Sequence, residues 1–255
     1  LPLAVRKTLA AGIGVVPDGG WDFAARCLGP LRRGLASKAP ADKARRLAMM
    51  LAAPDFAHFY EALLAHWPAP DKLVRGGHWH LPAHVSSAAA LGLDHFEFMQ
   101  THDTLAYLPD DILVKVDRAA MAVSLETRAP LIDRRVLEFA WNLPPAFKRR
   151  DGQGKWLMRE LLARYVPRAM FERPKQGFAV PLEAWLRGPL RDWAEHLLDP
   201  ARLAADGFFD PQPIRACWQA LLKGQDGMHY RIWDVLMFQA WLARYGNHVI
   251  KGDVR

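Results

Sequence analysis

Two charged clusters in the middle of the sequence combine residue types that could carry out acid–base or phosphate chemistry. The first follows an apolar run and reads Glu126-Thr127-Arg128-Ala129-Pro130. The residue before a proline is pushed toward extended geometry, and side chains alternate along an extended chain. Glu126 and Arg128 should therefore point the same way, as an acid beside a base on a rigid connection. Such a pair suits a functional site, and it equally suits a structural salt bridge.

The second cluster surrounds a single lysine in a stiff loop. Lys175 lies between Pro174, which restricts the backbone, and Gly177, which lets a backbone approach a ligand. Arg173 precedes the proline. An ammonium group presented in this way can stabilise negatively charged phosphate. On local sequence alone, a solvated loop lysine is the simpler interpretation of Lys175.

The helix that should deliver the first cluster spans residues 110–125. Its start carries Pro109 and two aspartates, which are favourable at the positive end of a helix dipole. At about 100° per residue, the charged residues Asp111, Lys115 and Arg118 form one narrow strip. Nearly all other positions are apolar, so we predict a largely buried helix.

Asp117 falls outside that charged strip and should be buried with the apolar residues. A buried carboxylate is strongly destabilising unless it is paired or hydrogen bonded. The nearest candidates for pairing are Arg118, on a different face, and Arg128, beyond the helix. Asp117 therefore belongs either to a buried ion-pair network that fixes helix packing or to a position near substrate.

Further elements should place the remaining charged side chains. Asp133 is expected to cap a helix over 133–142, which stops before a Pro-Pro pair. The segment 151–154 has the composition of a turn. The helix after that turn carries Lys155 and Arg159 one turn apart, so both cations should lie on one face.

The chain as a whole is predicted to be mostly α-helical, without a convincing series of alternating strands or a repeat of fixed period. The turn-rich segment Pro68–Pro82 is the expected weak boundary. It would separate an N-terminal helical part, 1–82, from a motif-bearing helical part, 83–255, within one continuous domain fragment. Helical spacing recurs over 3–11, 21–35, 40–52, 54–66, 87–101, 110–125, 133–142, 155–165, 181–198, 211–223 and 228–245.

The last predicted helix, His229–Tyr245, is apolar on nearly every side. A helix that is hydrophobic all round is buried. Its aromatic residues are therefore predicted to be core side chains rather than parts of a cofactor site.

The composition excludes several classes of protein. A chain of 255 residues that is 51% hydrophobic and 24% charged can bury a core, so disorder is excluded. Cys27 and Cys217 are too few and too far apart for a disulfide framework, which predicts core thiols in a reducing, cytoplasmic compartment. No apolar run reaches the roughly 18 residues of a membrane span, and no secretory signal is present.

The net charge of +7 raises nucleic acid as a partner. The basic residues come as scattered pairs, however, and not as one stripe interleaved with aromatic residues. No nucleic-acid partner is therefore expected, and a basic surface that suits an anionic nucleotide or a partner domain fits the sequence better.

The run YLPDDILVKVDRAAMAVSLETRAPLID, 107–133, resembles the synthetase domain of glutamine-dependent asparagine synthetases at nearly every position. The family pattern is a D-D-x-L-x-K-x-D-R core, followed by L-E-x-R-x-P and a final Asp. The runs R-P-K-x-G-F around Lys175 and G-x-G-K-x-x-x-R around Lys155 match as well. One departure is Ala120, where the family commonly has a serine, and it should weaken a local hydrogen bond. The resemblance is good over about 103–245 and loose before that.

This resemblance implies the helical C-terminal portion of an adenine-nucleotide α-hydrolase-like (PP-loop) synthetase domain, with the parallel nucleotide-binding sheet largely outside the chain. The family activates the side chain of aspartate with ATP and Mg²⁺, giving a β-aspartyl-adenylate that is attacked by ammonia from a glutaminase domain. Lys175 is expected to supply catalytic charge, and Glu126 to accept a proton from, or to orient, the attacking amine or a neighbouring side chain. Residues expected to contact substrate or to hold these two in place are Asp117, Arg118, Arg128, Asp133, Arg173 and Lys155; no metal ligand is assigned.

Several family motifs do not occur in the sequence: the S-G-G-x-D-S phosphate loop, the G-G-D-E-x-x-G-G-Y segment and the glutaminase cysteine. Because the chain also begins at Leu1, we expect a piece of a longer protein that makes no amide alone. Two alternatives stay open. Relatives with the same ATP chemistry act on other carboxylates, in sugars, peptides or β-lactam precursors, and a helical interaction module would have no chemistry. Self-association into a homo-oligomer is also left open.

Overall fold

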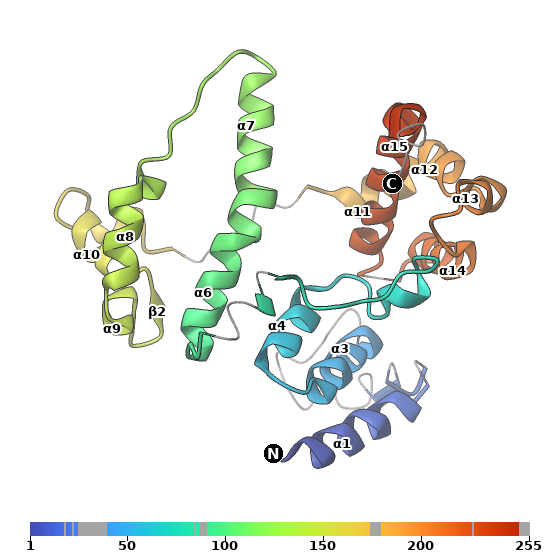
Figure 1. The fold of residues 1–255 in the computed structure, drawn as a ribbon, viewed down its shortest axis with the longest axis horizontal. Coiled ribbons are helices and arrows are strands. Elements are labelled where there is room, and N and C mark those ends of the chain that lie inside the picture. Colours follow the sequence, from blue (N-terminus) through green and yellow to red (C-terminus); the bar gives the residue numbers. More distant parts are fainter. Residues whose placement is uncertain are drawn as a thin grey trace. The chain divides into compact units, whose positions relative to one another are not determined.

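The structure is a computed structural model that describes residues 1–17, 19–21, 23–24, 40–83, 85–86, 91–173, 180–225 and 227–249. The chain divides into two compact units (Figure 1). Unit 1 is discontinuous and combines Leu1–Asp103 with Val180–Arg255, and unit 2 is Thr104–Ala179 between them. Both units are built from helices, so the predicted mostly α-helical fold is confirmed.

Unit 1 contains helices from both ends of the sequence. The helix predicted over 40–52 is confirmed with those bounds, whereas the one predicted over 181–198 is divided at Gly188. Most of the helix predicted over 21–35 lies outside the described residues. The elements are α1 (Leu3–Val15), α3 (Pro40–Ala52), α4 (Phe56–Leu64), η2 (Pro70–Lys72), α6 (His95–Leu105, which ends just inside unit 2), α11 (Leu182–Arg187), α12 (Arg191–Leu197), α13 (Pro200–Asp206), α14 (Pro211–Leu222) and α15 (His229–Val249).

Unit 2 contains short helices and one small antiparallel hairpin. The elements are the π-helical η3 (Leu108–Leu113), α7 (Val114–Met121), η4 (Pro130–Ile132), α8 (Arg134–Asn142), α9 (Pro145–Lys148), β1 (Arg149–Arg150), β2 (Gln153–Gly154), α10 (Trp156–Leu162) and η5 (Arg168–Met170).

The main hydrophobic core of unit 1 is formed by α11–α15. Trp218 on α14 is fully buried, and the indole N–H donates to Glu195 Oε1 at 2.7 Å. Arg215 donates to the other carboxylate oxygen, also at 2.7 Å. Burial opposes ionisation of Glu195, but these two hydrogen bonds and the positive charges of Arg215 and Arg191 together lower the pKa of the carboxyl. Asp210 caps the start of α14 by accepting a hydrogen bond from Gln212 N, as expected for an aspartate before a helix.

Helix α15 is buried on one face only, which corrects the prediction of burial on all sides. Ile232 and Leu236 are fully buried against the core. Met237, Trp241 and Tyr245 follow at four-residue spacing on the other face, and all are exposed. The reason is that α15 packs against α11, α12 and α14, which cover one side of it.

Gln239 lies on the buried face of α15 and carries an amide without a hydrogen-bond partner in the described part of the chain. An unsatisfied buried polar group destabilises a fold by about 1–3 kcal/mol. Replacing Gln239 with Met, which has a similar shape, is therefore expected to raise the free energy of unfolding by about 1–2 kcal/mol. Urea denaturation of the chain measures this change.

The matched control is Gln219→Met on α14, because that glutamine is exposed. Its effect should stay within about 0.5 kcal/mol. A loss of stability in Gln239→Met, relative to this control, would contradict the expected result.

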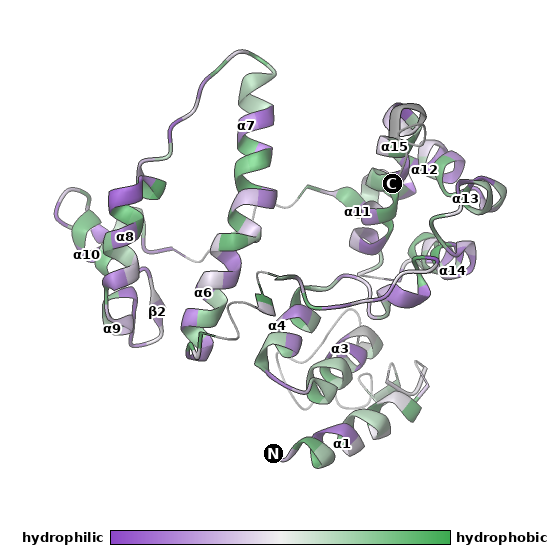
Figure 2. Cartoon of the chain, viewed as in Figure 1, coloured by the Kyte–Doolittle hydropathy of each residue, from purple (hydrophilic) through white to green (hydrophobic). Residues whose placement is uncertain are grey.

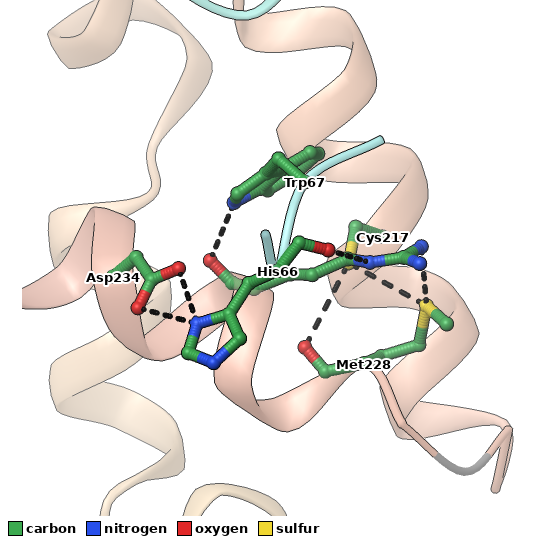
Figure 3. A network of polar contacts seen from close by, with 6 residues as sticks. His66, Trp67, Cys217, Met228 and Asp234 are labelled. Carbon is green, nitrogen blue, oxygen red and sulfur yellow. Dashed lines mark hydrogen bonds and ion pairs between the residues drawn. The ribbon is translucent and has the colours of Figure 1, made fainter. Parts of the chain in front are cut away.

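The segment around His66 is fastened to α15 over a sequence separation of about 165 residues (Figure 3). The indole of Trp67 donates to Arg231 O at 3.0 Å, and Arg231 Nε donates to His66 O at 2.8 Å. His66 Nδ1 lies 2.8 Å from the Asp234 carboxylate. These contacts join the two sequence-distant parts of unit 1.

The predicted boundary segment Pro68–Pro82 also contacts the C-terminal part of unit 1. Leu73 is buried in the core of the C-terminal helices, and its carbonyl accepts from Asp210 N at 2.9 Å. Val74 forms a β-bridge with Phe209. The compact units therefore do not divide at Pro82, because hydrogen bonds and apolar contacts hold this turn-rich segment within unit 1.

A second, smaller cluster in unit 1 joins α4 to α6. The hydroxyl of Tyr60 donates to Asp103 Oδ1 at 2.8 Å, and the buried His102 Nε2 lies 2.7 Å from Glu61 Oε1. Burial and the hydrogen bond to Asp103 raise the pKa of the Tyr60 hydroxyl. Polar contacts therefore connect His102 and Asp103, near the C-terminal end of α6, to α4.

The structure describes one of the two cysteines, Cys217. Cys217 is a buried thiol, with Sγ 3.6 Å from Met228 Sδ (Figure 3), so the prediction of a core thiol is confirmed. Cys27 lies outside the described residues.

Candidate functional site

The helix that leads to the first charged cluster begins earlier than predicted. Helical hydrogen bonding continues past α6, since Asp110 N donates to Ala106 O at 2.9 Å. The prediction of a helix start at Asp110 is therefore wrong, and Pro109 lies within the π-helical segment η3. A proline inside a helix removes one hydrogen bond, and π-helical turns are a common accompaniment of such breaks.

Helix α7 is exposed, which corrects the prediction that it is buried. None of its residues is buried, and Figure 2 shows hydrophobic and hydrophilic residues along its visible side. Within the described chain, α7 packs closely only against the preceding η3. The apolar pattern of the sequence is present, but the unit places no other described helix closely against it.

Asp117 is exposed with the rest of α7, contrary to the prediction. Neither Asp117 nor Arg118 has a side-chain hydrogen bond or ion pair with another described residue. The buried ion-pair network considered for Asp117 is therefore absent from the described part of unit 2. Both side chains are available to a further surface or a ligand.

A tight cap ends α7 at Met121, four residues before the predicted end at Leu125. Leu125 N donates to Ala120 O and Ser124 N donates to Met121 O, both at 3.0 Å. This is a Schellman arrangement, which needs a left-handed residue, and Ser124 has φ 58°. Glycine usually fills that position, so a serine there holds a strained turn two residues before Glu126.

Glu126 and Arg128 point the same way, as their alternation before Pro130 predicts. Arg128 Nη2 lies 2.5 Å from Glu126 Oε1. Both side chains are exposed, at 70% for the glutamate and 77% for the arginine. Exposed ion pairs contribute only about 0–1 kcal/mol to stability. The pair therefore fixes the direction of two charges more than it stabilises the fold.

Asp133 caps α8, which confirms the predicted helix start. Its side chain accepts from Arg135 N at 2.9 Å and from Arg135 Nε at 3.0 Å. The side-chain hydrogen bond from Arg135, followed by the backbone one, lowers the pKa of the Asp133 carboxyl. These contacts account for Asp133 as a structural cap.

Lys155 follows a β-hairpin, where the sequence predicted only a turn. Arg149 pairs with Gly154, and Arg150 with Gln153. Both loop residues have positive φ, at 50° for Asp151 and 78° for Gly152. An Asp-Gly pair favours the two-residue turn that joins the strands of a hairpin. Asp151-Gly152 is therefore the sequence signal that could have predicted this hairpin.

Lys155 itself has φ 59°, an unusual backbone for a residue with a long side chain, and stands at the start of α10. Arg159 lies one turn further on, as predicted, and donates from Nε to Gly154 O at 3.3 Å. Lys155 makes no hydrogen bond or ion pair with Glu126, Arg128 or Asp133 among the described residues.

The second predicted cluster is described only up to Arg173, which is exposed. Lys175 lies outside the described residues, so its catalytic role stays a prediction. The residues just before it are held by Arg168, whose guanidinium contacts Glu160 at 2.7 Å and Glu172 at 2.8 Å. These two carboxylates raise the pKa of Arg168.

The described residues contain no group of three or more histidine, cysteine or acidic side chains that could hold a metal ion. Among the described helices, none is both long and apolar enough to span a membrane.

Comparisons with known proteins give one consistent family. The sequence profile of the asparagine synthase family matches residues 12–243. Asparagine synthetase (glutamine-hydrolyzing) 1 of Bacillus subtilis is 29% identical over 143 residues, which are 56% of this chain and 22% of that protein. A Mycobacterium tuberculosis protein whose name also describes an asparagine synthetase is 34% identical over 170 residues, 66% of this chain and 25% of that protein.

A relative with a different name is Amidase chry2 of Gibberella zeae, 26% identical over 176 residues, 66% of this chain and 24% of that protein. The chain thus spans about a quarter of the length of these curated relatives. No solved structure matches the chain significantly.

Proposed function

The chain belongs to the asparagine synthase family, and from this premise we propose that it is the C-terminal part of the synthetase domain of an ATP-dependent amide ligase. The observation that carries the proposal is the family match over 12–243, which includes every candidate site residue. The described strands form only one two-stranded hairpin. We therefore place the parallel, PP-loop-type sheet that binds ATP, and the Mg²⁺ bound with it, on segments other than these residues.

The proposed reaction converts aspartate to asparagine in two steps. The side-chain carboxylate attacks the α-phosphorus of ATP, which gives an acyl-adenylate and releases pyrophosphate. Ammonia from a glutaminase domain then adds to the acyl carbon, and adenylate leaves. Negative charge grows on the departing pyrophosphate and on the oxygen of the tetrahedral adduct, and a preorganised cation stabilises both. Magnesium would supply further charge neutralisation at the phosphates.

The proposal gives Lys175 the role of that cation and Glu126 the role of proton acceptor for the attacking amine. The observed Glu126–Arg128 ion pair supports the second role, because it holds the carboxylate in one direction. Asp117 and Arg118, exposed on α7, would complete the surroundings of the substrate. Asp133, which caps α8, would help to hold the segment after Arg128 in place.

Glu126→Gln in the complete ligase is expected to separate the two steps. Aspartate-dependent exchange between ATP and pyrophosphate should persist. Formation of the amide product should fall on the order of 100-fold, because the glutamine side chain of the variant cannot accept a proton from the amine. The two half-reactions are measured on the same preparation.

The matched control is Glu138→Gln, since Glu138 is another exposed glutamate paired with an arginine, at 2.7 Å from Arg134. It should leave both half-reactions unchanged. An equal fall of exchange and amide formation in Glu126→Gln would show that this carboxylate does not act in the amination step.

A second candidate keeps the ATP chemistry and changes the carboxylate that is activated. The similarity to a protein with a different name, Amidase chry2, favours retaining this second candidate. A screen of carboxylic acids by ATP–pyrophosphate exchange, performed on the complete protein, distinguishes the two. Aspartate-dependent pyrophosphate release by these 255 residues alone would contradict the proposal that they form only part of the active site.

A further inference from the structure

Helix α15 (Figure 1) carries a row of exposed side chains on the face opposite to the one that packs in the core. The packed face lies against α11, α12 and α14. At about 100° per residue, the row covers about a quarter of the helix circumference and includes no buried side chain among the described residues. We call this row the exposed stripe. Its members, at alternating steps of four and three residues, are Tyr230, Asp234, Met237, Trp241 and Arg244.

The middle of the exposed stripe is apolar. Met237 is 39% exposed and Trp241 is 43% exposed. The Trp241 ring also contacts the rings of Phe238 and Tyr245, with centres 5.9 and 6.4 Å away, so the apolar surface is continuous. Isolated exposed apolar side chains are common, whereas a continuous group of them marks an interaction surface. Methionine and aromatic residues are also the types enriched at protein–protein interfaces.

Two side chains of opposite charge flank this apolar middle. Asp234, on the N-terminal side, is held in one direction by His66, whose Nδ1 lies 2.8 Å from the carboxylate (Figure 3). Arg244, on the C-terminal side, lies 5.5 Å from the ring centre of Tyr245. Arg244 forms no ion pair with a carboxylate in the described part of the chain. The exposed stripe thus begins with an acid and ends with a base.

The order and spacing of these residues make the exposed stripe complementary to itself. The steps between its last four members are three, four and three residues, which read the same from either end. When two copies of α15 lie antiparallel about a twofold axis, Asp234 of one copy is opposite Arg244 of the other. In the same arrangement, Met237 is opposite Trp241. A twofold interface requires this reciprocity, in which residue i contacts residue j and j contacts i.

A parallel pairing of the two helices does not match the charges. It would place Asp234 opposite Asp234 and Arg244 opposite Arg244, and like charges that face each other destabilise an interface. Alternating steps of three and four residues are also the spacing by which two helices pack along a common seam. Both the charges and the spacing therefore favour a second copy of this chain in the antiparallel direction.

We propose that the exposed stripe of α15 is the interface of a homodimer, formed with the same stripe of a second copy in antiparallel orientation. Stable interfaces bury about 1,200–2,000 Å² in total, and a single pair of helices is at the low end of interface sizes. The dimer is accordingly weak, with a Kd on the order of 10 µM. This proposal is independent of the proposed function, because self-association needs neither ATP nor a carboxylate substrate.

The test is sedimentation equilibrium of the 255-residue chain from about 1 to 200 µM, which brackets the expected Kd. Arg244→Glu places two acids opposite each other at both ends of the interface. The Kd of the dimer is expected to rise more than tenfold, because these like charges repel. Asp234→Lys combined with Arg244→Glu exchanges the two charges and should restore the Kd to within about threefold of the unaltered chain.

Two further variants separate the interface from effects on folding and on net charge. Trp241→Ala removes apolar contact without a change of charge, and this chain should stay monomeric throughout the concentration range. Lys223→Glu, at an exposed lysine after α14, makes the same change of net charge as Arg244→Glu and should alter the Kd less than about twofold. Circular dichroism of each variant reports whether the helices are retained.

Three results would overturn the proposal. The first is an unaltered chain that is monomeric at every concentration, which would mean that another partner or no partner covers the exposed stripe. The second is an equal rise of the Kd in Arg244→Glu and Lys223→Glu, which would indicate an effect of net charge alone. The third is a folded charge-exchange variant that dimerises no better than Arg244→Glu, which would exclude the antiparallel pairing of Asp234 with Arg244.

Discussion

Lys175→Ala in the complete ligase is expected to lower kcat about 1000-fold, the upper range for removing one group that stabilises transition-state charge. The reason is that an ammonium group interacts most strongly with pyrophosphate as it departs and with the tetrahedral oxygen as it forms. An interaction made only in the transition state lowers kcat and kcat/KM together, so KM for ATP should change little. Initial rates of aspartate-dependent pyrophosphate release measure both constants.

The matched control for that experiment is Lys115→Ala. Lys115 is an exposed lysine on α7 that already pairs with Asp111 at 3.2 Å. Its loss should change kcat less than about threefold, because an exposed pair is weak and makes no transition-state contact. A tenfold rise of KM in Lys175→Ala with unchanged kcat would refute the catalytic role and indicate uniform substrate binding instead.

Trp218→Ala is expected to destabilise the chain by about 3–5 kcal/mol, the usual range for removing a large aromatic side chain from a core. Trp218 is fully buried among the helices of unit 1, so alanine leaves a cavity. The substitution also removes the hydrogen bond from the indole to Glu195 and leaves Arg215 as a side-chain donor to that carboxylate. Urea denaturation followed by circular dichroism measures the change.

Trp241→Ala provides the comparison within the same unit. Trp241 lies on the exposed face of α15, with 43% of its surface accessible. Its removal should reduce stability by about 1 kcal/mol or less. Equal losses for the two tryptophans would show that Trp218 does not occupy the core position described above.

Local sequence rules predicted the parts of the structure that depend on neighbouring residues. Asp133 starts α8 because an aspartate can accept from the first free N–H groups, and Glu126 aligns with Arg128 because a proline follows. The hairpin turn at Asp151-Gly152 could also have been predicted, because an Asp-Gly pair favours such turns. Such features need only a few consecutive residues, and no knowledge of distant packing.

Burial was the property that sequence patterns could not supply. The apolar pattern of α7 resembles that of a core helix, yet burial depends on what other segments lie across it, which periodicity does not contain. The same limit explains α15, where Trp241 is exposed although the helix is apolar on nearly every side. The strain at Lys155 was equally hidden, because φ depends on the hairpin that precedes it.

The discontinuity of unit 1 has a consequence for the order in which the protein can acquire its structure during synthesis. Trp67 and Leu73 emerge from the ribosome long before their partners on α14 and α15 exist, and the whole of unit 2 is translated in between. The entropic cost of closing so long a loop grows only with the logarithm of its length, so the inserted unit is a small thermodynamic burden. The burden is a kinetic one instead, since Trp67 and Leu73, which pack against the C-terminal helices, stay uncovered until those helices are made.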